Sequence, residues 1–389
     1  MIQSCTVGRT GGWSDPHRFV LFWKARMRTL PAEELRRVLR PLADARPFGG
    51  VAYADAEVFA FEQARIFAQS WVCVGRTEDV EHPGDWLRET VATEAILVVR
   101  GADLRLRAFL DVCRHRGASL VGGRPCGRTA ELACRYHGWR YGLDGRLREP
   151  ARHADGDLFP VRADTWNGFV FVCLAADVAP LATWLGEPPP WLATPLLVKR
   201  ARRTAYVVDA NWKFLVENFQ ESHHFPSIHQ GLEAVTPTRH AQTWTGSGRW
   251  LGGTMTIEGA ETVSLDGSRH GRPQVSIEGR VLDAMLFPGL LTSVQPDYLI
   301  TYRLRPLSAG STHVTAEIHF HPAAFIPGFD APDVHAFWDR VNAEDRAICE
   351  DQQRNTGSRG YDPIGYAPVE EGVHAFDTMV ATIHLEAQR

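Results

Sequence analysis

Hydrophobic and polar residues alternate with helical spacing near the start of the chain. In residues 58–69, aromatic and aliphatic side chains recur between charged ones, which predicts an amphipathic helix. An earlier helix is predicted to begin near Pro31, because proline and acidic residues are favoured in a first turn. Residues 1–26 show no such period. We therefore expect residues 1–29 to form a disordered extension and residues 30–70 to form helices.

The pattern changes between residues 71 and 175. Short apolar runs such as residues 95–99 and 169–172 are separated by glycine and proline. Runs of this length and spacing predict a small all-β domain.

The second half of the chain, residues 176–389, mixes both patterns. Apolar positions at helical spacing predict a helix over residues 211–223 and a final helix over residues 332–354. Alternating runs at residues 298–304 and 313–318 predict strands. We therefore expect an α+β chain with two domains, a β-rich domain and an antiparallel sheet flanked by helices, and we assign residues 30–70 to the second domain.

Composition narrows the class of protein. The 389 residues include 42 basic and 46 acidic side chains, which gives a formal net charge of −4. A chain without a basic block gives no reason to expect a nucleic acid or an anionic membrane as a partner. It also has no apolar run of about 18 residues of the kind that crosses a membrane. We expect a cytoplasmic protein.

Two of the seven cysteines stand out because histidines follow them closely. The sequence reads Cys-Arg-His-Arg-Gly from Cys113, with His115, and Cys-Arg-Tyr-His-Gly-Trp from Cys134, with His137. Two thiolates and two imidazoles can bind a structural zinc ion or a two-iron, two-sulfide cluster. Isolated cysteines are usually small buried apolar residues, and we expect this of the other five: Cys5, Cys73, Cys126, Cys173 and Cys349.

These two segments resemble the ligand loops of the Rieske domain family. The resemblance continues through Tyr-Gly-Leu-Asp-Gly at residues 141–145. It implies a [2Fe-2S] cluster in which Cys113 and Cys134 bind one iron and His115 and His137 bind the other.

A second group of candidate ligands lies in the second half of the chain. On a helix, Glu217, Glu221 and His224 would share one face, and Pro226 would end that helix so that His229 folds back toward His224. Two imidazoles and one carboxylate form the facial triad that suits Fe(II) and leaves positions open for dioxygen.

The whole arrangement resembles the α subunit of Rieske non-heme iron oxygenases. The catalytic motif of that family, Glu-Asn-x-x-acid-x-Tyr-His-x4-His, is matched from Glu217 and Asn218 to His229. The resemblance implies a helix-grip catalytic domain, an acidic third ligand on the carboxy-terminal helix and an acid that links the iron to the cluster of a neighbouring subunit. We expect Asp345 as the third ligand; the alternatives are Glu344 and Asp351, among the acids of that helix, which also include Asp339 and Glu350.

Two residues depart from the common form of this motif. The linking acid is Glu221 where aspartate is usual, and His223 replaces the tyrosine before the ligand histidine, so that His223 could compete as a ligand or tune the link. A glutamate at this position resembles the branch that oxidises carnitine, choline or glycine betaine.

The resemblance also implies partners. We expect O2, a small organic substrate, a homotrimer and a separate NAD(P)H-dependent reductase, with or without a ferredoxin, because the chain lacks a dinucleotide-binding glycine motif of its own. The reaction would be hydroxylation, dihydroxylation or N-dealkylation. Two alternatives remain open: a Rieske electron-transfer protein with a non-catalytic ligand-binding domain, and a zinc-stabilised binding protein.

Overall fold

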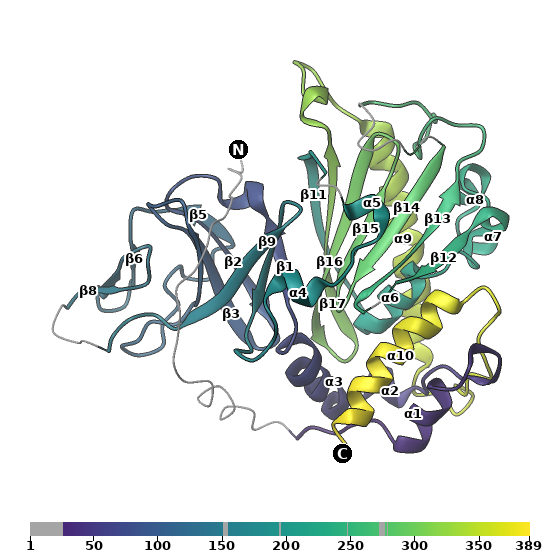
Figure 1. Cartoon of the computed structure of the whole chain (residues 1–389), viewed down its shortest axis with the longest axis horizontal. Helices are drawn as coiled ribbons and strands as arrows, with labels where there is room; N and C mark the ends of the chain where they lie inside the picture. Colours follow the sequence, from purple (N-terminus) through teal and green to yellow (C-terminus); the bar gives the residue numbers. More distant parts are fainter. Residues whose placement is uncertain (1–25, 151–154, 194–195, 247, 272–276, 278) are drawn as a thin grey trace. The chain divides into compact units, whose positions relative to one another are not determined.

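The computed structural model describes residues 26–150, 155–193, 196–246, 248–271, 277 and 279–389 (Figure 1). These residues form two compact units. The first contains Gln63–Trp184, and the second contains Leu185–Arg389 together with the described residues before Gln63. Most of the predicted extension lies outside the described residues. Its last part, residues 26–29, is held by Arg28, whose N–H donates to the Glu57 carbonyl oxygen at 3.1 Å.

The first unit is built from antiparallel strands. Its larger sheet has the order β1-β10-β9-β4-β3-β2-β5. The strands are β1 (Val72–Arg76), β2 (Asp85–Val91), β3 (Glu94–Arg100), β4 (Leu106–Leu110), β5 (Cys126–Arg128), β9 (Pro160–Trp166) and β10 (Phe169–Cys173). A smaller sheet contains β6 (Leu132–Ala133), β7 (Arg140–Tyr141) and β8 (Leu147–Glu149).

The apolar run in β3 does not alternate with polar residues because both faces of this strand are buried. Ile96 and Val98 point into one hydrophobic core, and Leu97 and Val99 point into another. Successive side chains of a strand face opposite ways, so a strand between two cores must be apolar on both faces.

The second unit contains a seven-stranded antiparallel sheet of order β11-β17-β16-β15-β14-β13-β12 (Figure 1). The strands are β11 (Lys199–Val208), β12 (Gln242–Thr245), β13 (Trp250–Thr256), β14 (Arg280–Leu286), β15 (Leu290–Val294), β16 (Tyr298–Ser308) and β17 (Ser311–Phe320). Strands β16 and β17 contain the two runs that the sequence predicted most clearly.

Helices accompany both units. The longer ones are α1 (Ala32–Val38), α3 (Ala56–Glu62), α6 (Trp212–Phe219), α9 (Pro332–Asn355) and α10 (Glu371–Glu386). The short ones are α2 (Val51–Ala54), α4 (Leu181–Leu185), α5 (Pro190–Ala193), α7 (Phe225–Ile228) and α8 (Gln230–Val235). Within the described ranges, none of these helices combines the length and apolar character needed to cross a bilayer.

Helix α9 agrees with the prediction to one residue, but it is not the final helix. Helix α10 follows it and buries Phe376, Val380 and His384. Nδ1 of His384 accepts a hydrogen bond from the backbone N–H of Leu30 at 3.2 Å. Helix α10 therefore contacts the start of the described chain. The two segments are about 350 residues apart in the sequence, so no local pattern predicts this contact.

Helix α6 is shorter than predicted. The N–H of Gln220 closes its last turn on the carbonyl oxygen of Val216 at 3.1 Å. The carboxylate of Glu221 then accepts the backbone N–H of His224 at 3.1 Å, which favours a turn in place of another helical residue. The prediction that Glu217, Glu221 and His224 share one helical face was wrong.

A buried ion pair fixes the first turn of α6. Nζ of Lys213 lies 2.6 Å from Oε1 of Glu62, and both side chains are fully buried. The indole N–H of Trp212 donates to Oε2 of the same glutamate at 2.8 Å. Burial opposes ionisation of Glu62, but Lys213 and His384 lower its pKa below the ordinary value.

Glu217, one turn later, takes part in a second buried network. Its Oε1 accepts the hydroxyl of Tyr53 at 2.9 Å, and Tyr366 donates to Oδ2 of the neighbouring Asp377 at 2.6 Å. Burial raises the pKa of both carboxyls, that of Glu217 well above its usual range and that of Asp377 to about 7. Burial thus favours the protonated form of both carboxyls, and the network anchors α6.

Candidate metal centres

The two Cys-His segments of the first unit form the same kind of turn. Residues 113–117 follow β4, and residues 134–138 join β6 to β7. The N–H of Gly117 donates to the Cys113 carbonyl oxygen, and that of Gly138 to the Cys134 carbonyl oxygen, both at 2.9 Å. The two glycines have φ angles of +74° and +71°, a conformation that side chains disfavour. The turns therefore require glycine at this position.

These turns bring the four predicted cluster ligands together. Cys113 and Cys134 are buried, whereas His115 and His137 are exposed. The Nδ1 atoms of the two imidazoles lie 3.1 Å apart. Burial raises the pKa of the Cys134 thiol, and the neighbouring Cys113 adds to this shift. Two thiols on the inner side and two nitrogen donors on the outer side fit a Rieske cluster.

Neighbouring side chains fix the orientation of these ligands. The ring of Trp139 stacks on His115 with centroids 4.9 Å apart, and Tyr136 lies 3.7 Å from the ring of His137. The hydroxyl of Tyr141 lies 3.4 Å from Sγ of Cys113. Such outer contacts hold metal ligands in place and tune the bound group.

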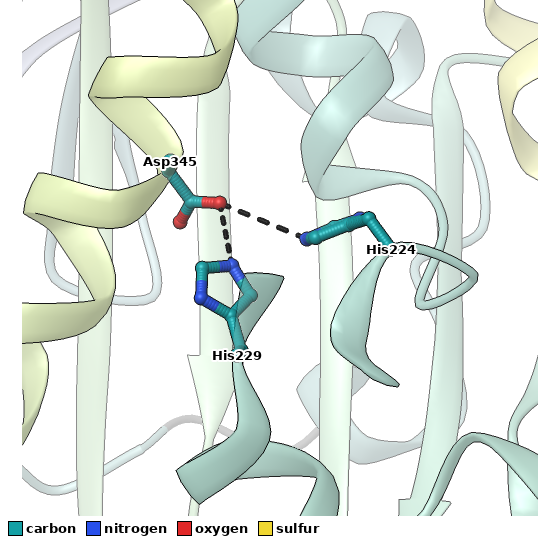
Figure 2. A group of neighbouring side chains, drawn as sticks. All are labelled: His224, His229 and Asp345. Carbon is teal, nitrogen blue, oxygen red and sulfur yellow. Dashed lines mark hydrogen bonds and ion pairs between the residues drawn. The ribbon is translucent and has the colours of Figure 1, made fainter. Parts of the chain in front are cut away.

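The second unit brings together His224, His229 and Asp345 (Figure 2). The two histidines flank the four-residue helix α7. Pro226 lies in the first turn of α7 and does not end α6, which stops at Phe219, so the predicted role of that proline was wrong. Nε2 of His229 lies 2.8 Å from Oδ1 of Asp345, and Nε2 of His224 lies 3.7 Å from the same oxygen. The ligand atoms lie within 4.8 Å of one another. Two imidazoles and one carboxylate at this spacing fit a facial triad for iron.

Each imidazole is oriented by a carboxylate on its other nitrogen. Oε1 of Glu221 lies 2.6 Å from Nδ1 of His224, and Oε2 of Glu344 lies 2.7 Å from Nδ1 of His229. When each Nδ1 carries the proton, each Nε2 presents its lone pair to a metal, which is the usual arrangement of histidine ligands. Burial opposes a charge on His229, but Asp345 and Glu344 raise its pKa above the ordinary value.

Asn218 completes the group. Its side-chain amide donates to Oδ1 of Asp345 at 2.7 Å. Helix α6 thus contacts the candidate ligand on α9 directly. Asn218 was expected in the site from its place in the motif, but its partner was not predicted, and neither was the contact between Glu344 and His229.

The acids of α9 have separate roles. Asp339 pairs with Arg202 at 2.8 Å and Asp351 pairs with Arg354 at 2.7 Å. The structure thus brings Asp345 and Glu344, but neither Asp339 nor Asp351, to the imidazoles. Asp345 lies near Nε2 of both histidines, whereas Glu344 contacts the other nitrogen of His229 alone. His223 is exposed and does not line the cavity beside the triad, so the structure does not bring it to the site.

A cavity of about 240 Å³ opens beside the triad. One wall is a single face of the sheet, and the other comes from α6, α7 and α9. Its lining is mostly apolar, and it includes the aromatic residues Tyr206, Phe219, Phe225, Tyr302 and Trp338.

Known proteins resemble this chain along most of its length. Residues 70–163 match the Rieske [2Fe-2S] domain family, and residues 197–386 match the ring hydroxylating alpha subunit (catalytic domain) family. The carnitine monooxygenase oxygenase subunit of Escherichia coli strain K12 is 33% identical over 359 residues, which cover 85% of this chain and 92% of the relative. The chain belongs to the Rieske oxygenase family.

Further similarities lie within the same family. The glycine betaine monooxygenase oxygenase subunit of Chromohalobacter salexigens is 30% identical over 388 residues, which cover 86% of each chain. A crystal structure of the quaternary ammonium Rieske monooxygenase CntA with an inhibitor matches with a TM-score of 0.78 and 25% identity, covering 92% of this chain and 99% of that one. Naphthalene 1,2-dioxygenase from Rhodococcus shares the fold, with a TM-score of 0.80 at 17% identity and coverage of 92% of this chain and 99% of that one.

The chain is thus the oxygenase component of a Rieske oxygenase. Its cofactors are a [2Fe-2S] cluster and a mononuclear iron, it depends on a reductase, and it acts on a small substrate. The expected α+β fold, with an all-β Rieske domain and an antiparallel catalytic sheet gripped by helices, is confirmed.

Proposed function

We propose that this Rieske oxygenase hydroxylates or oxidatively N-dealkylates a small quaternary amine. The observation that carries the proposal is the triad of His224, His229 and Asp345 at the side of an apolar, partly aromatic cavity. Aromatic faces attract quaternary ammonium groups. The relatives named for carnitine and glycine betaine support the same class of substrate.

The proposal gives each candidate residue a role. Cys113, His115, Cys134 and His137 hold the cluster, and the triad holds the iron. When bound, the cluster supplies electrons and the iron activates dioxygen. Glu221 and Glu344 keep the two imidazoles in the tautomer and orientation that metal binding requires.

Residues around the triad prepare the cavity for the substrate. Asn218 donates to Asp345 and thereby restrains the carboxylate as the substrate enters. The apolar lining replaces water next to the reacting carbon, which strengthens electrostatic interactions with the substrate and prevents side reactions. Phe219 and Tyr302, whose rings lie 6.4 Å apart in an edge-to-face arrangement, provide aromatic faces for the ammonium group.

We also propose a homotrimer in which Glu221 of one subunit faces the cluster histidines of the next. His115 and His137 are exposed, as a group that exchanges electrons with another subunit must be. The structure of a quaternary ammonium Rieske monooxygenase that is 25% identical to this chain gives insight into inter-subunit electron transfer. Electrons would come from NAD(P)H through a separate reductase, directly or through a ferredoxin.

Iron counting and oxygen uptake test the proposal. Purified protein should contain about three irons per chain, two in the cluster and one in the triad. With a reductase from a related system, oxygen consumption should depend on a quaternary amine from a panel of betaines, carnitine, choline and aromatic acids. His224→Ala should abolish consumption and leave the visible spectrum of the cluster unchanged.

Two results would contradict the proposal. Two irons per chain, unaffected by His229→Ala, would favour an electron-transfer protein with a non-catalytic binding domain. Oxygen uptake that depends only on the aromatic acids would retain the oxygenase and reject the amine.

A further inference from the structure

Asp283 is an acidic residue in the sheet wall of the cavity. It lies on β14, opposite Gly253 on β13 and Ser293 on β15, and all three line the cavity. Gly253 has no side chain that could cover the carboxylate on one flank. On the other flank, the hydroxyl of Ser293 hydrogen-bonds to it.

The polar groups around Asp283 leave two acceptors without donors. Nε2 of Gln295, a fully buried residue, donates to the hydroxyl oxygen of Ser293 at 2.7 Å. Oδ1 of Asp283 and Oε1 of Gln295 are both buried, and neither has a hydrogen-bond partner among the described residues. Burial raises the pKa of Asp283 to about 7, and the Ser293 hydroxyl opposes this shift. Buried acceptors without donors are costly, so this wall is suited to a ligand that brings a positive charge or a donor.

The other carboxylates that line the cavity are already engaged. Glu221 contacts His224, and Asp345 contacts His229 and Asn218. Both belong to the helical wall that holds the metal site. Asp283 is on the facing sheet, so its charge is available to a ligand.

Asp283 and the triad serve the same cavity. The pKa of Tyr302 is raised by burial and then by neighbours that include Asp345 and Asp283. The phenol of Tyr302 is therefore within electrostatic range of both carboxylates. A ligand held at Asp283 lies against the aromatic lining and in the same cavity as the iron ligands.

We propose that Asp283 is the residue that selects a cationic substrate, by pairing its carboxylate with the ammonium group. This inference rests on the proposed amine oxygenase and narrows it. A charge pair in a site with few waters is stronger than one in solvent, and an apolar cavity with one free carboxylate favours a cation over an uncharged molecule of the same shape.

Binding to the iron-loaded enzyme tests this role without turnover. Choline and its uncharged carbon analogue 3,3-dimethylbutan-1-ol form one pair of probes, and glycine betaine and 3,3-dimethylbutanoate form a second. Affinities are measured by tryptophan fluorescence at pH 8, where the carboxyl is ionised. The native enzyme should bind choline more tightly than its uncharged analogue, or glycine betaine more tightly than the butanoate. Asp283→Asn should weaken binding of the preferred ammonium compound by roughly tenfold to a hundredfold and leave the affinity for the uncharged alcohol unchanged.

Two further variants control for trivial causes. Asp283→Glu keeps the charge and should retain most of the preference. Asp339→Asn removes one acidic charge from α9 at an exposed ion pair and should change neither affinity. Iron content and the cluster spectrum of each variant show whether it is folded and loaded.

The possible failures are distinguishable. If the native enzyme prefers a cation and Asp283→Asn keeps that preference, Asp283 does not select the substrate, although the amine oxygenase stands. If the native enzyme binds neither ammonium compound more tightly than its analogue, the proposed substrate class is wrong, and so is the proposed role of Asp283. If Asp283→Asn weakens the analogues as much as the cations, the residue only shapes the cavity.

Discussion

The four candidate cluster ligands come from two turns that lie between residues 113 and 137, whereas Asp345 lies 116 residues after the histidine it contacts. The cluster turns are closed by their own backbone hydrogen bonds and by glycines in the left-handed region. The triad depends on α9 lying close to the segment that contains His224 and His229. One site is therefore specified locally, and the other by tertiary packing.

The two sites also differ in the solvent exposure of their candidate ligands. The cluster imidazoles are exposed, but the side chain of His229 is only 1% exposed. A group that exchanges electrons with a partner must lie near the surface, and a group that activates dioxygen must be shielded from water. The comparison predicts that the two sites can be lost independently.

The largest expected effect is the selective loss of one metal group. Cys134→Ser should remove the cluster and its visible absorption, because a thiolate ligand is lost, and leave the mononuclear iron bound. Asp345→Ala should do the reverse. Both should abolish turnover, and iron analysis with visible spectroscopy separates them. If either variant lost both groups, the two sites would not be independent.

Next in size is the effect of breaking the ion pair beneath α6. Lys213→Met leaves Glu62 buried without its cation and should lower the free energy of unfolding by about 3–5 kcal/mol. Chemical denaturation followed by tryptophan fluorescence measures the loss, and iron should leave the triad before the cluster bleaches. The double variant with Glu62→Gln should recover part of the stability. If Lys213→Met changed neither the free energy of unfolding nor the retention of iron, the ion pair would not support the site.

A smaller effect is expected at the carboxylate behind His229. Glu344→Gln keeps the shape but weakens the contact with Nδ1, and it should lower iron affinity by roughly 10–100-fold. Competition with a chelator measures this affinity. Asp351→Asn on the same helix, which pairs only with exposed Arg354 among the described residues, should leave it unchanged. If the two variants bound iron with equal affinity, Glu344 would have no role in iron binding.

The smallest effect is expected at the cluster. Trp139→Leu removes the ring stacked on His115 and should cost about 0.5–1.5 kcal/mol of stability, the range measured for aromatic pairs. The cluster should still assemble, because its turns are intact, but it should bleach at lower denaturant concentration. A failure to assemble would mean that the cluster turns depend on packing as much as the triad does.

The predictions from sequence succeeded where neighbouring residues determine the structure. The strands β3, β10, β16 and β17 follow from apolar runs, and α9 follows from apolar positions at helical spacing after Pro332. Each cysteine and its neighbouring histidine lie in one turn that a glycine closes, so their placement in that turn depends only on nearby residues.

The errors fall where distant residues compete with local preference. Helix α6 stops at Phe219 because Glu221 bonds to the turn that follows, and Glu217 faces Tyr53 and Asp377 instead of the site. Helix α10 was missed although Val373, Phe376, Val380 and Ile383 recur with helical spacing; what the sequence could not show is the surface that its apolar face covers.

The sequence by itself determined the family of this chain and the chemistry of its two metal sites, and it predicted candidate residues to bind each metal. Tertiary structure decided which acid of α9 meets the histidines, that Glu344 and Glu221 orient them, and that Asp283 faces the same cavity from the sheet. The physical reason is the separation in sequence of the residues that interact. A turn closes through hydrogen bonds between residues a few positions apart, whereas a cavity wall is set by strand register and helix packing between segments that are distant in the sequence.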